Sequence, residues 1–228
     1  MKIIEIKKID TKNHNKITFI KVESENSKDI LQEIFHTLSD LSWIYKFDKE
    51  YIRNSFSERA KKTVENIYDK FFNLENDPLS SDAGEYVVSE ISRKTITNEL
   101  NYLDIPLSEL FNKKKSGNPG FDFYSQNDSQ VIIFGEAKYI KGKNAYSHGL
   151  KQVIKFIEDK KDIIDLVELD QFCDPIALEN VDNGVKGFAI GFSINNSSNQ
   201  NLISNIIKNP HYQALLKHHE IILVAVKI

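Results

Sequence analysis

Residues 121–139 read FDFYSQNDSQVIIFGEAKY, and this stretch decides the expected fold. Residues 121–125 and 130–139 are rich in aromatic and β-branched side chains, which favour strands. The polar residues 126–129 between them are typical of a turn. Two strands joined by so short a connection pair as a hairpin. The stretch therefore predicts a β-hairpin whose second strand ends in charged residues.

Three charged residues of this hairpin are expected to converge. Glu136 and Lys138 lie two positions apart on one strand, so their side chains leave the same face. Asp122 lies early in the first strand, and the hairpin folds it back towards Glu136. Two carboxylates, with the backbone carbonyl of Ala137 as a further ligand, suit Mg²⁺ or Mn²⁺. The ammonium of Lys138 beside them could stabilise a phosphoryl transition state and orient the attacking water.

The rest of the chain predicts an α/β protein. Apolar side chains at helical spacing predict helices over 28–41, 56–73, 82–100, 145–160, 202–208 and 211–218. Further strands are expected in an N-terminal hairpin over 1–22 and at 186–194 and 221–226, whereas the acidic stretch 162–184 shows no regular pattern. This order predicts a central mixed sheet with helices on both faces. Residues 76–228 form the expected core, and residues 1–75 are expected to pack on it as a hairpin with helices.

The hairpin resembles the PD-(D/E)XK nuclease superfamily, which has the restriction-endonuclease-like fold. The matching residues are Pro119, Asp122 and the E-x-K element Glu136-Ala137-Lys138. The α-β-β-α-β order from about 82 to 194 also matches, which is roughly half of the chain. The sequence departs from the family pattern in one place, because two residues separate Pro119 from Asp122.

The resemblance implies two more site residues. Family members often take an acidic residue from the helix before the hairpin, and Glu85 matches that role as a catalytic and metal-binding residue. They often place a Gln or Lys on the helix after E-x-K, where Gln152 matches. Each has a simpler interpretation. Glu85 also fits a capping box with Asp82 as the cap, and Gln152 fits a solvated helix position.

The charge distribution suits a polyanionic ligand. Residues 112–161 hold ten lysines against five acidic residues, a net charge of +5, and the rest of the chain carries −8 of the total of −3. The candidate phosphate contacts are Lys113, Lys114, Lys115, Lys141, Lys143, Lys151 and Lys155. The alternative for the first three is an ordinary solvated loop.

These features predict a metal-dependent nuclease that hydrolyses phosphodiester bonds, in DNA rather than RNA. Within the superfamily the chain is similar to small nucleases of bacterial antiphage defence, including the Hachiman type that works with a helicase, and a restriction endonuclease subunit would look alike. The resemblance implies a helicase or another defence-system protein as partner, or a homodimer, because double-strand cutting needs two sites or strand separation. The alternatives are a catalytically silent nucleic-acid-binding or assembly subunit on the same fold, and an interaction protein whose hairpin is only structural.

Composition narrows the class of protein further. The 228 residues include one cysteine, Cys173, so no intramolecular disulfide can form and a reducing cytoplasm is expected. The N-terminal apolar run is too short and too charged for a signal peptide, and no segment approaches a membrane span. The sequence holds no phosphate-binding loop of the nucleotide-hydrolase type, so the chain is not expected to hydrolyse ATP by itself.

Overall fold

The computed structural model describes residues 1–9, 16–24, 27–72, 81–112, 120–195 and 201–228. Within these ranges the strands are β1 (Lys2–Lys8), β2 (Lys16–Glu23), β3 (Phe123–Gln126), β4 (Ile132–Lys138), β5 (Lys186–Ser193) and β6 (Glu220–Lys227). The longer helices are α1 (Ser27–Ser39), α2 (Glu50–Phe72), α3 (Ser81–Leu100), α5 (Tyr146–Glu158) and α8 (Pro175–Asp182). The shorter ones are η1 (Ser42–Lys46), α4 (Ser108–Phe111), α6 (Lys161–Ile164), α7 (Leu166–Leu169), α9 (Leu202–Ile207) and α10 (Pro210–Leu215). No helix in the described ranges is both long enough and apolar enough to cross a membrane.

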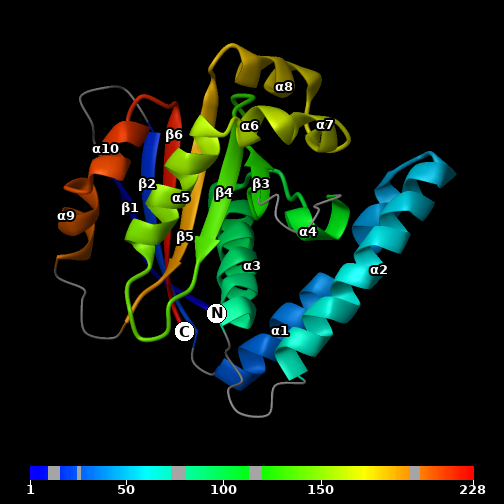
Figure 1. Ribbon diagram of the computed structural model, residues 1–228, viewed down its shortest axis with the longest axis horizontal. Helices are drawn as coiled ribbons and strands as arrows, with labels where there is room; N and C mark the ends of the chain where they lie inside the picture. Colours follow the sequence, from blue (N-terminus) through cyan, green and yellow to red (C-terminus); the bar gives the residue numbers. More distant parts are fainter. Residues whose placement is uncertain (10–15, 25–26, 73–80, 113–119, 196–200) are drawn as a thin grey trace.

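The six strands form one mixed sheet in the order β1-β2-β6-β5-β4-β3. The four inner strands are parallel to one another, and β1 and β3 pair antiparallel at the two edges. The expected α/β class with a central mixed sheet flanked by helices is therefore confirmed (Figure 1). The apolar runs in β5 and β6 are explained by their place in the middle, since both strands are buried along nearly their whole length.

Helices α3 and α5 cover opposite faces of the sheet. A side chain at Gly191 of β5 would collide with Ser92 of α3, whereas its neighbour Ile190 lies against Gly149 of α5. Successive residues of a strand point to opposite faces, so the two helices sandwich the sheet between them. Figure 1 shows α5 crossing the sheet on one side and α10 lying beside it.

An aromatic cluster fixes the entry into the β3–β4 hairpin. The ring of Phe121 packs 5.2 Å from that of Phe134 on β4 and 5.1 Å from that of Phe156 on α5. Phe188 on β5 joins the cluster 5.9 Å from Phe134. Because Phe121 is fully buried here, the next residue, Asp122, is held at the edge of the sheet.

The structure differs from the sequence prediction in three elements. The stretch 162–184 is not irregular, because it contains α6, α7 and α8. These helices have four to eight residues, too few for an apolar repeat to stand out. Helix α2 begins at Glu50 rather than near residue 56, since its first turns are mostly polar and only Ile52 continues the apolar stripe before Phe56. The expected N-terminal hairpin exists, and its strand β2 pairs with β6 from Lys16 to Glu23, which makes it part of the central sheet.

Candidate active site

Strand β4 brings Glu136 and Lys138 together at its carboxyl end. The Nζ atom of Lys138 lies 2.9 Å from Oε1 of Glu136, so the two side chains share a face as their spacing predicts. The Glu136 side chain is 2% exposed and the Lys138 side chain 23%. The pair is therefore an acid and an amine at the rim of the sheet, with the acid on the buried side.

Asp122 lies beside this pair, immediately before β3 rather than within it. Its N–H donates to the carbonyl of Gly135 at 2.8 Å, and its Oδ2 accepts from the N–H of Ala137 at 2.8 Å. The ladder between β3 and β4 ends at the pair Phe123 and Gly135, so the Asp122 carboxylate takes the place of the next backbone acceptor. The N–H and C=O of one strand residue leave the same edge, so the carbonyl of Ala137 also faces this carboxylate.

Helix α3 contributes a third acid, Glu85. Its Oε1 lies 3.3 Å from Nζ of Lys138, and its side chain is 40% exposed. The helix can approach β4 this closely because Gly84 has no side chain, since a Cβ there would collide with the ring of Tyr139. Asp82 lies within the first turn of α3 and pairs with Lys70 at 3.2 Å, and Glu85 points to Lys138.

Burial and mutual repulsion raise the pKa values of two acids in this cluster. Burial raises the pKa of Glu136 well above its usual value, and the charge of Asp122 raises it further, while Lys138 opposes both. Burial also raises the pKa of Glu85, and Asp122 adds to the effect. Burial alone would lower the pKa of Lys138, but Glu136, Asp122 and Glu85 together raise it, so the amine is charged at neutral pH.

The same cluster offers oxygen ligands to a divalent cation. Oε2 of Glu136 is buried and has no hydrogen-bond partner among the described residues, although an unpaired buried carboxylate oxygen is costly. The Asp122 carboxylate lies next to Glu136, on the edge of β4 from which the carbonyl of Ala137 leaves. These groups together give an all-oxygen donor set that fits Mg²⁺ or Mn²⁺. Among the described residues, no group of three or more acidic, histidine or cysteine side chains is gathered closely enough to hold a metal ion. The fit therefore rests on two carboxylates and a backbone carbonyl.

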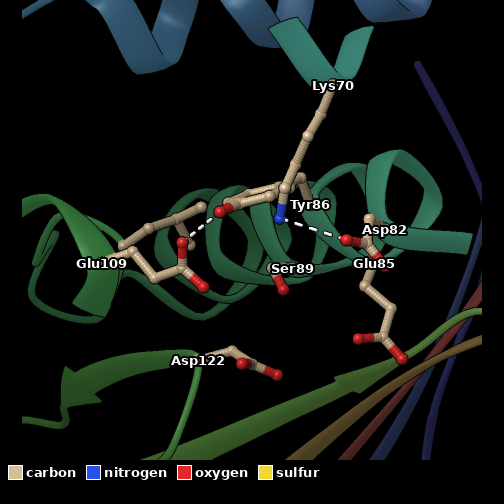
Figure 2. Close-up of a pocket in the computed structure, with 8 residues that line it drawn as sticks. Lys70, Asp82, Glu85, Tyr86, Ser89, Glu109 and Asp122 are labelled. Atoms are coloured by element: carbon tan, nitrogen blue, oxygen red, sulfur yellow. Dashed lines mark hydrogen bonds and ion pairs between the residues drawn. The ribbon is translucent and has the colours of Figure 1, made fainter. Parts of the chain in front are cut away.

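A cleft of about 160 Å³ adjoins the cluster (Figure 2). It shares Asp122 and Glu85 with the cluster and is otherwise lined by Lys70, Asp82, Tyr86, Ser89, Leu107 and Glu109. The Tyr86 hydroxyl donates to the Glu109 carboxylate, which ties α3 to α4 across the cleft. Sequence reasoning missed Lys70 and Glu109, because helical spacing identifies buried residues of α2 and α4 but not which polar ones face a cleft.

The remaining predicted residues are less closely associated with the cluster. Gln152 on α5 is half-buried, and in the described part of the chain it makes no hydrogen bond or ion pair with the four charged residues. Exposed lysines lie on the β4–α5 loop and on α5, namely Lys141, Lys143, Lys151 and Lys155. Lys113, Lys114, Lys115 and Pro119 lie outside the described residues.

No protein-family model matches the chain, and no curated protein matches it in sequence.

Proposed function

We propose that this chain is a metal-dependent nuclease of the PD-(D/E)XK type, with its active site at Asp122, Glu136 and Lys138. One observation carries the proposal. Glu136 is buried at a strand end, where one of its oxygens pairs with an amine, the other has no partner in the described part of the chain, and a second carboxylate lies beside it. A structural ion pair needs neither a free buried oxygen nor a second acid next to it, since both raise the free energy of the folded state.

Asp122, Glu136 and the carbonyl of Ala137 would hold Mg²⁺ or Mn²⁺, with Glu85 at the outer side. When bound there, such an ion lowers the pKa of a water molecule and neutralises charge on the phosphate. Asp122 is positioned for this role by its hydrogen bond to Ala137 at 2.8 Å, which fixes the orientation of the carboxylate. Glu136 is positioned by the burial of β4.

Lys138 would act directly on the substrate. Its charged amine lies at the rim of the site, where it can donate to a phosphate oxygen and stabilise the charge that develops there. In the structure the amine is shared between Glu136 and Glu85 at 2.9 and 3.3 Å. Lys138 therefore still has Glu85 as a partner when Glu136 binds a cation. In this role Glu85 is a positioning residue for Lys138.

The restriction-endonuclease-like fold belongs to this proposal. The elements α3, β3, β4, α5 and β5 follow one another in the order expected for that fold, with α4 inserted before β3 and α6, α7 and α8 inserted before β5, and E-x-K lies at the end of β4. DNA is the proposed substrate in preference to RNA, in antiphage defence or restriction, with a helicase, another defence-system protein or a second copy as partner. The exposed lysines near the site support a polyanionic substrate.

The principal alternative is a catalytically silent nucleic-acid-binding or assembly subunit on the same fold. Such a subunit would bind DNA equally well with or without Asp122, because a silent site needs no cation. The presence of all three charged residues favours the enzyme.

The test is cleavage of double-stranded DNA, single-stranded DNA and RNA by the purified full chain with Mg²⁺ or Mn²⁺. We expect the wild type to cut DNA, and Glu136→Ala or Lys138→Ala to reduce the rate by at least about 100-fold. The matched controls are Glu99→Ala on α3 and Lys61→Ala on α2, both exposed and away from the cleft lining, which should cut at the wild-type rate. Tight binding without cutting, unaffected by Asp122→Ala, would support the silent subunit instead.

A further inference from the structure

Helix α2 forms one wall of the cleft beside the candidate active site. Lys70, near the end of α2, reaches across to the beginning of α3, as Figure 2 shows. Among the described residues that line the cleft, Lys70 is the only one with a positive charge, against Asp82, Glu85, Glu109 and Asp122. The N-terminal part of the chain thus contributes a cation to a cleft that is otherwise acidic.

Lys70 is held weakly by its present partners. Its Nζ lies 3.2 Å from Oδ2 of Asp82, and the two side chains are 41% and 67% exposed. Ion pairs this exposed contribute little, so the amine can exchange partners at small cost. The same Nζ lies 5.2 Å from the centre of the Tyr86 ring, so the side chain stays over the cleft when its partner changes.

The helix that carries Lys70 is itself firmly placed. Arg59 donates to the carbonyl of Phe111 at 2.7 Å, and Thr63 donates to the carbonyl of Glu109 at 2.8 Å. Both bonds join α2 to α4, whose Glu109 also lines the cleft. Ile67 and Phe71, on either side of Lys70, are buried. Lys70 is therefore presented from a rigid element, as a substrate-binding residue must be.

We propose that Lys70 binds a backbone phosphate of the nucleic-acid strand whose neighbouring phosphodiester reaches Asp122, Glu136 and Lys138. This proposal rests on the proposed nuclease function. In the free protein the amine of Lys70 is paired with Asp82, and the entering phosphate replaces Asp82 as its partner. The cleft then holds the strand on both sides, by the cation at the carboxylates and by Lys70 on α2. Residues 1–75 thereby take part in binding the substrate.

The test is binding of fluorescent DNA to the full chain, with Ca²⁺ in place of Mg²⁺ so that cutting is slow, over a range of salt concentrations. We expect Lys70→Ala to weaken binding several-fold and equally on unrelated sequences, and to reduce the slope of log affinity against log salt by about 1. The matched control is Lys61→Ala, because Lys61 lies on the same helix, is 60% exposed and is also paired with an acid, Glu58. This control should leave affinity and slope unchanged.

A second variant tests the exchange of partners. Asp82→Asn frees Lys70, so this single substitution should tighten DNA binding. The same substitution should have a much smaller effect on DNA binding when it is combined with Lys70→Ala. Equal tightening in both backgrounds would overturn the proposal, because it would reflect only the loss of a negative charge. So would a Lys70→Ala variant that binds and responds to salt like Lys61→Ala.

The two proposals fail in different ways. If the wild type cuts DNA with Mg²⁺ but Lys70→Ala binds DNA as the wild type does, the nuclease function stands and the proposed role of Lys70 is wrong. If the wild type binds through Lys70 but never cuts, the nuclease function is wrong and the phosphate contact stands. If the wild type neither binds nor cuts, both are wrong.

Discussion

Glu136 is a carboxylate that the fold buries with a single amine as partner. Its Oε1 faces Lys138 at 2.9 Å, and its Oε2 has no partner within the ranges that the structure describes. Burial and the charge of Asp122 hold its pKa well above the usual value, so the ionised carboxylate is less favourable in the folded protein than it is in water. Each unit of such a shift corresponds to about 1.4 kcal/mol. A site that binds a cation needs this arrangement, because the cation supplies the charge that is otherwise lacking.

The substitution Glu136→Gln replaces this buried carboxylate by a neutral amide. The amide keeps an acceptor for Lys138 and offers donors towards Asp122, so we expect the metal-free protein to become more stable at neutral pH, by about 1 kcal/mol. DNA cleavage should be lost at the same time. Urea unfolding at pH 7 measures the first effect, with Glu99→Gln as an exposed control on α3. A destabilised Glu136→Gln protein would indicate that the Glu136–Lys138 ion pair is structural.

His218 provides a pH dependence that is independent of the candidate site. It is 7% exposed, and its Nε2 has no hydrogen-bond partner among the residues described in the structure. Burial lowers the pKa of His218 to about 4 from 6.5, and Lys217 and Lys186 contribute in the same direction. The unfolded chain therefore takes up a proton at pH values where the folded protein does not. Stability should fall as the pH drops from above 6.5 towards 4.

The variant His218→Phe should remove this pH dependence, which is on the order of 3 kcal/mol over the whole window. The measurement is the free energy of unfolding at several pH values. His219→Phe is the matched control, because His219 is adjacent and exposed. If His218→Phe and His219→Phe have the same pH profile as the wild type, His218 does not titrate as proposed.

At the residue scale, the sequence predicted those site residues whose chemical type and spacing along a strand both indicate a shared site. The two-residue spacing of Glu136 and Lys138 predicted their shared face, and the hairpin predicted Asp122 as a neighbour. Lys70 could not be predicted, because its place at the cleft depends on how α2 packs on α3 and α4. Nothing in the local sequence distinguishes it from Lys61 or Lys62, which lie on the same helix away from the cleft lining.

At the scale of elements, the contact between α3 and β4 determines whether Glu85 reaches Lys138. Gly84 permits this contact, since a side chain there would overlap the Tyr139 ring. In an exposed helix a change from Gly to Ala would be stabilising by about 1 kcal/mol. Here the collision outweighs that gain, because neither the helix backbone nor the 8% exposed Tyr139 has room to move.

We therefore expect Gly84→Ala to destabilise the protein by about 1–3 kcal/mol, as overpacking does. It should also slow DNA cleavage by about 100-fold, because displacing α3 moves Glu85 and the cleft wall. Thermal unfolding and single-turnover cleavage measure the two effects. The double variant Gly84→Ala/Tyr139→Ala restores the space and should recover much of the lost activity. No recovery would mean that Tyr139 has a role of its own.

Elements were predictable in proportion to their length and periodicity. The strands β5 and β6 and the helices α3 and α5 have long apolar patterns, and their predicted bounds agree with the structure to within a few residues. Helices α6 and α7 have four residues each and were missed. The sheet order was beyond prediction, because β2 and β6 pair across nearly the whole length of the chain.

At the scale of the whole molecule, the N-terminal region is joined to the rest by a sheet ladder and by an aromatic cluster. Strand β2 pairs with β6 over eight residues, from Lys16 to Glu23. Trp43 of η1 packs 5.4 Å from Phe56 of α2 and 5.9 Å from Phe172, which follows α7. Separating the two regions would expose both the inner strand β6 and these rings to water. The chain should therefore unfold as one cooperative unit.

The single tryptophan makes this prediction easy to test, because Trp43 reports only on the N-terminal region and its interface. Urea unfolding followed by tryptophan fluorescence should coincide with unfolding followed by far-ultraviolet circular dichroism. A fluorescence transition at clearly lower urea would show that the N-terminal region unfolds first. In that case α2 would not be a fixed wall of the cleft.

A crystal structure of the protein soaked in Mn²⁺, with anomalous diffraction to locate the ion, is the sharpest test of the proposed metal site. We expect one ion bound by Asp122, Glu136 and the carbonyl of Ala137, with Lys138 released from Glu136 and still within reach of Glu85. Crystals in which Lys138 remains paired with Glu136, with no ion at Asp122 at millimolar Mn²⁺, would overturn the proposed site.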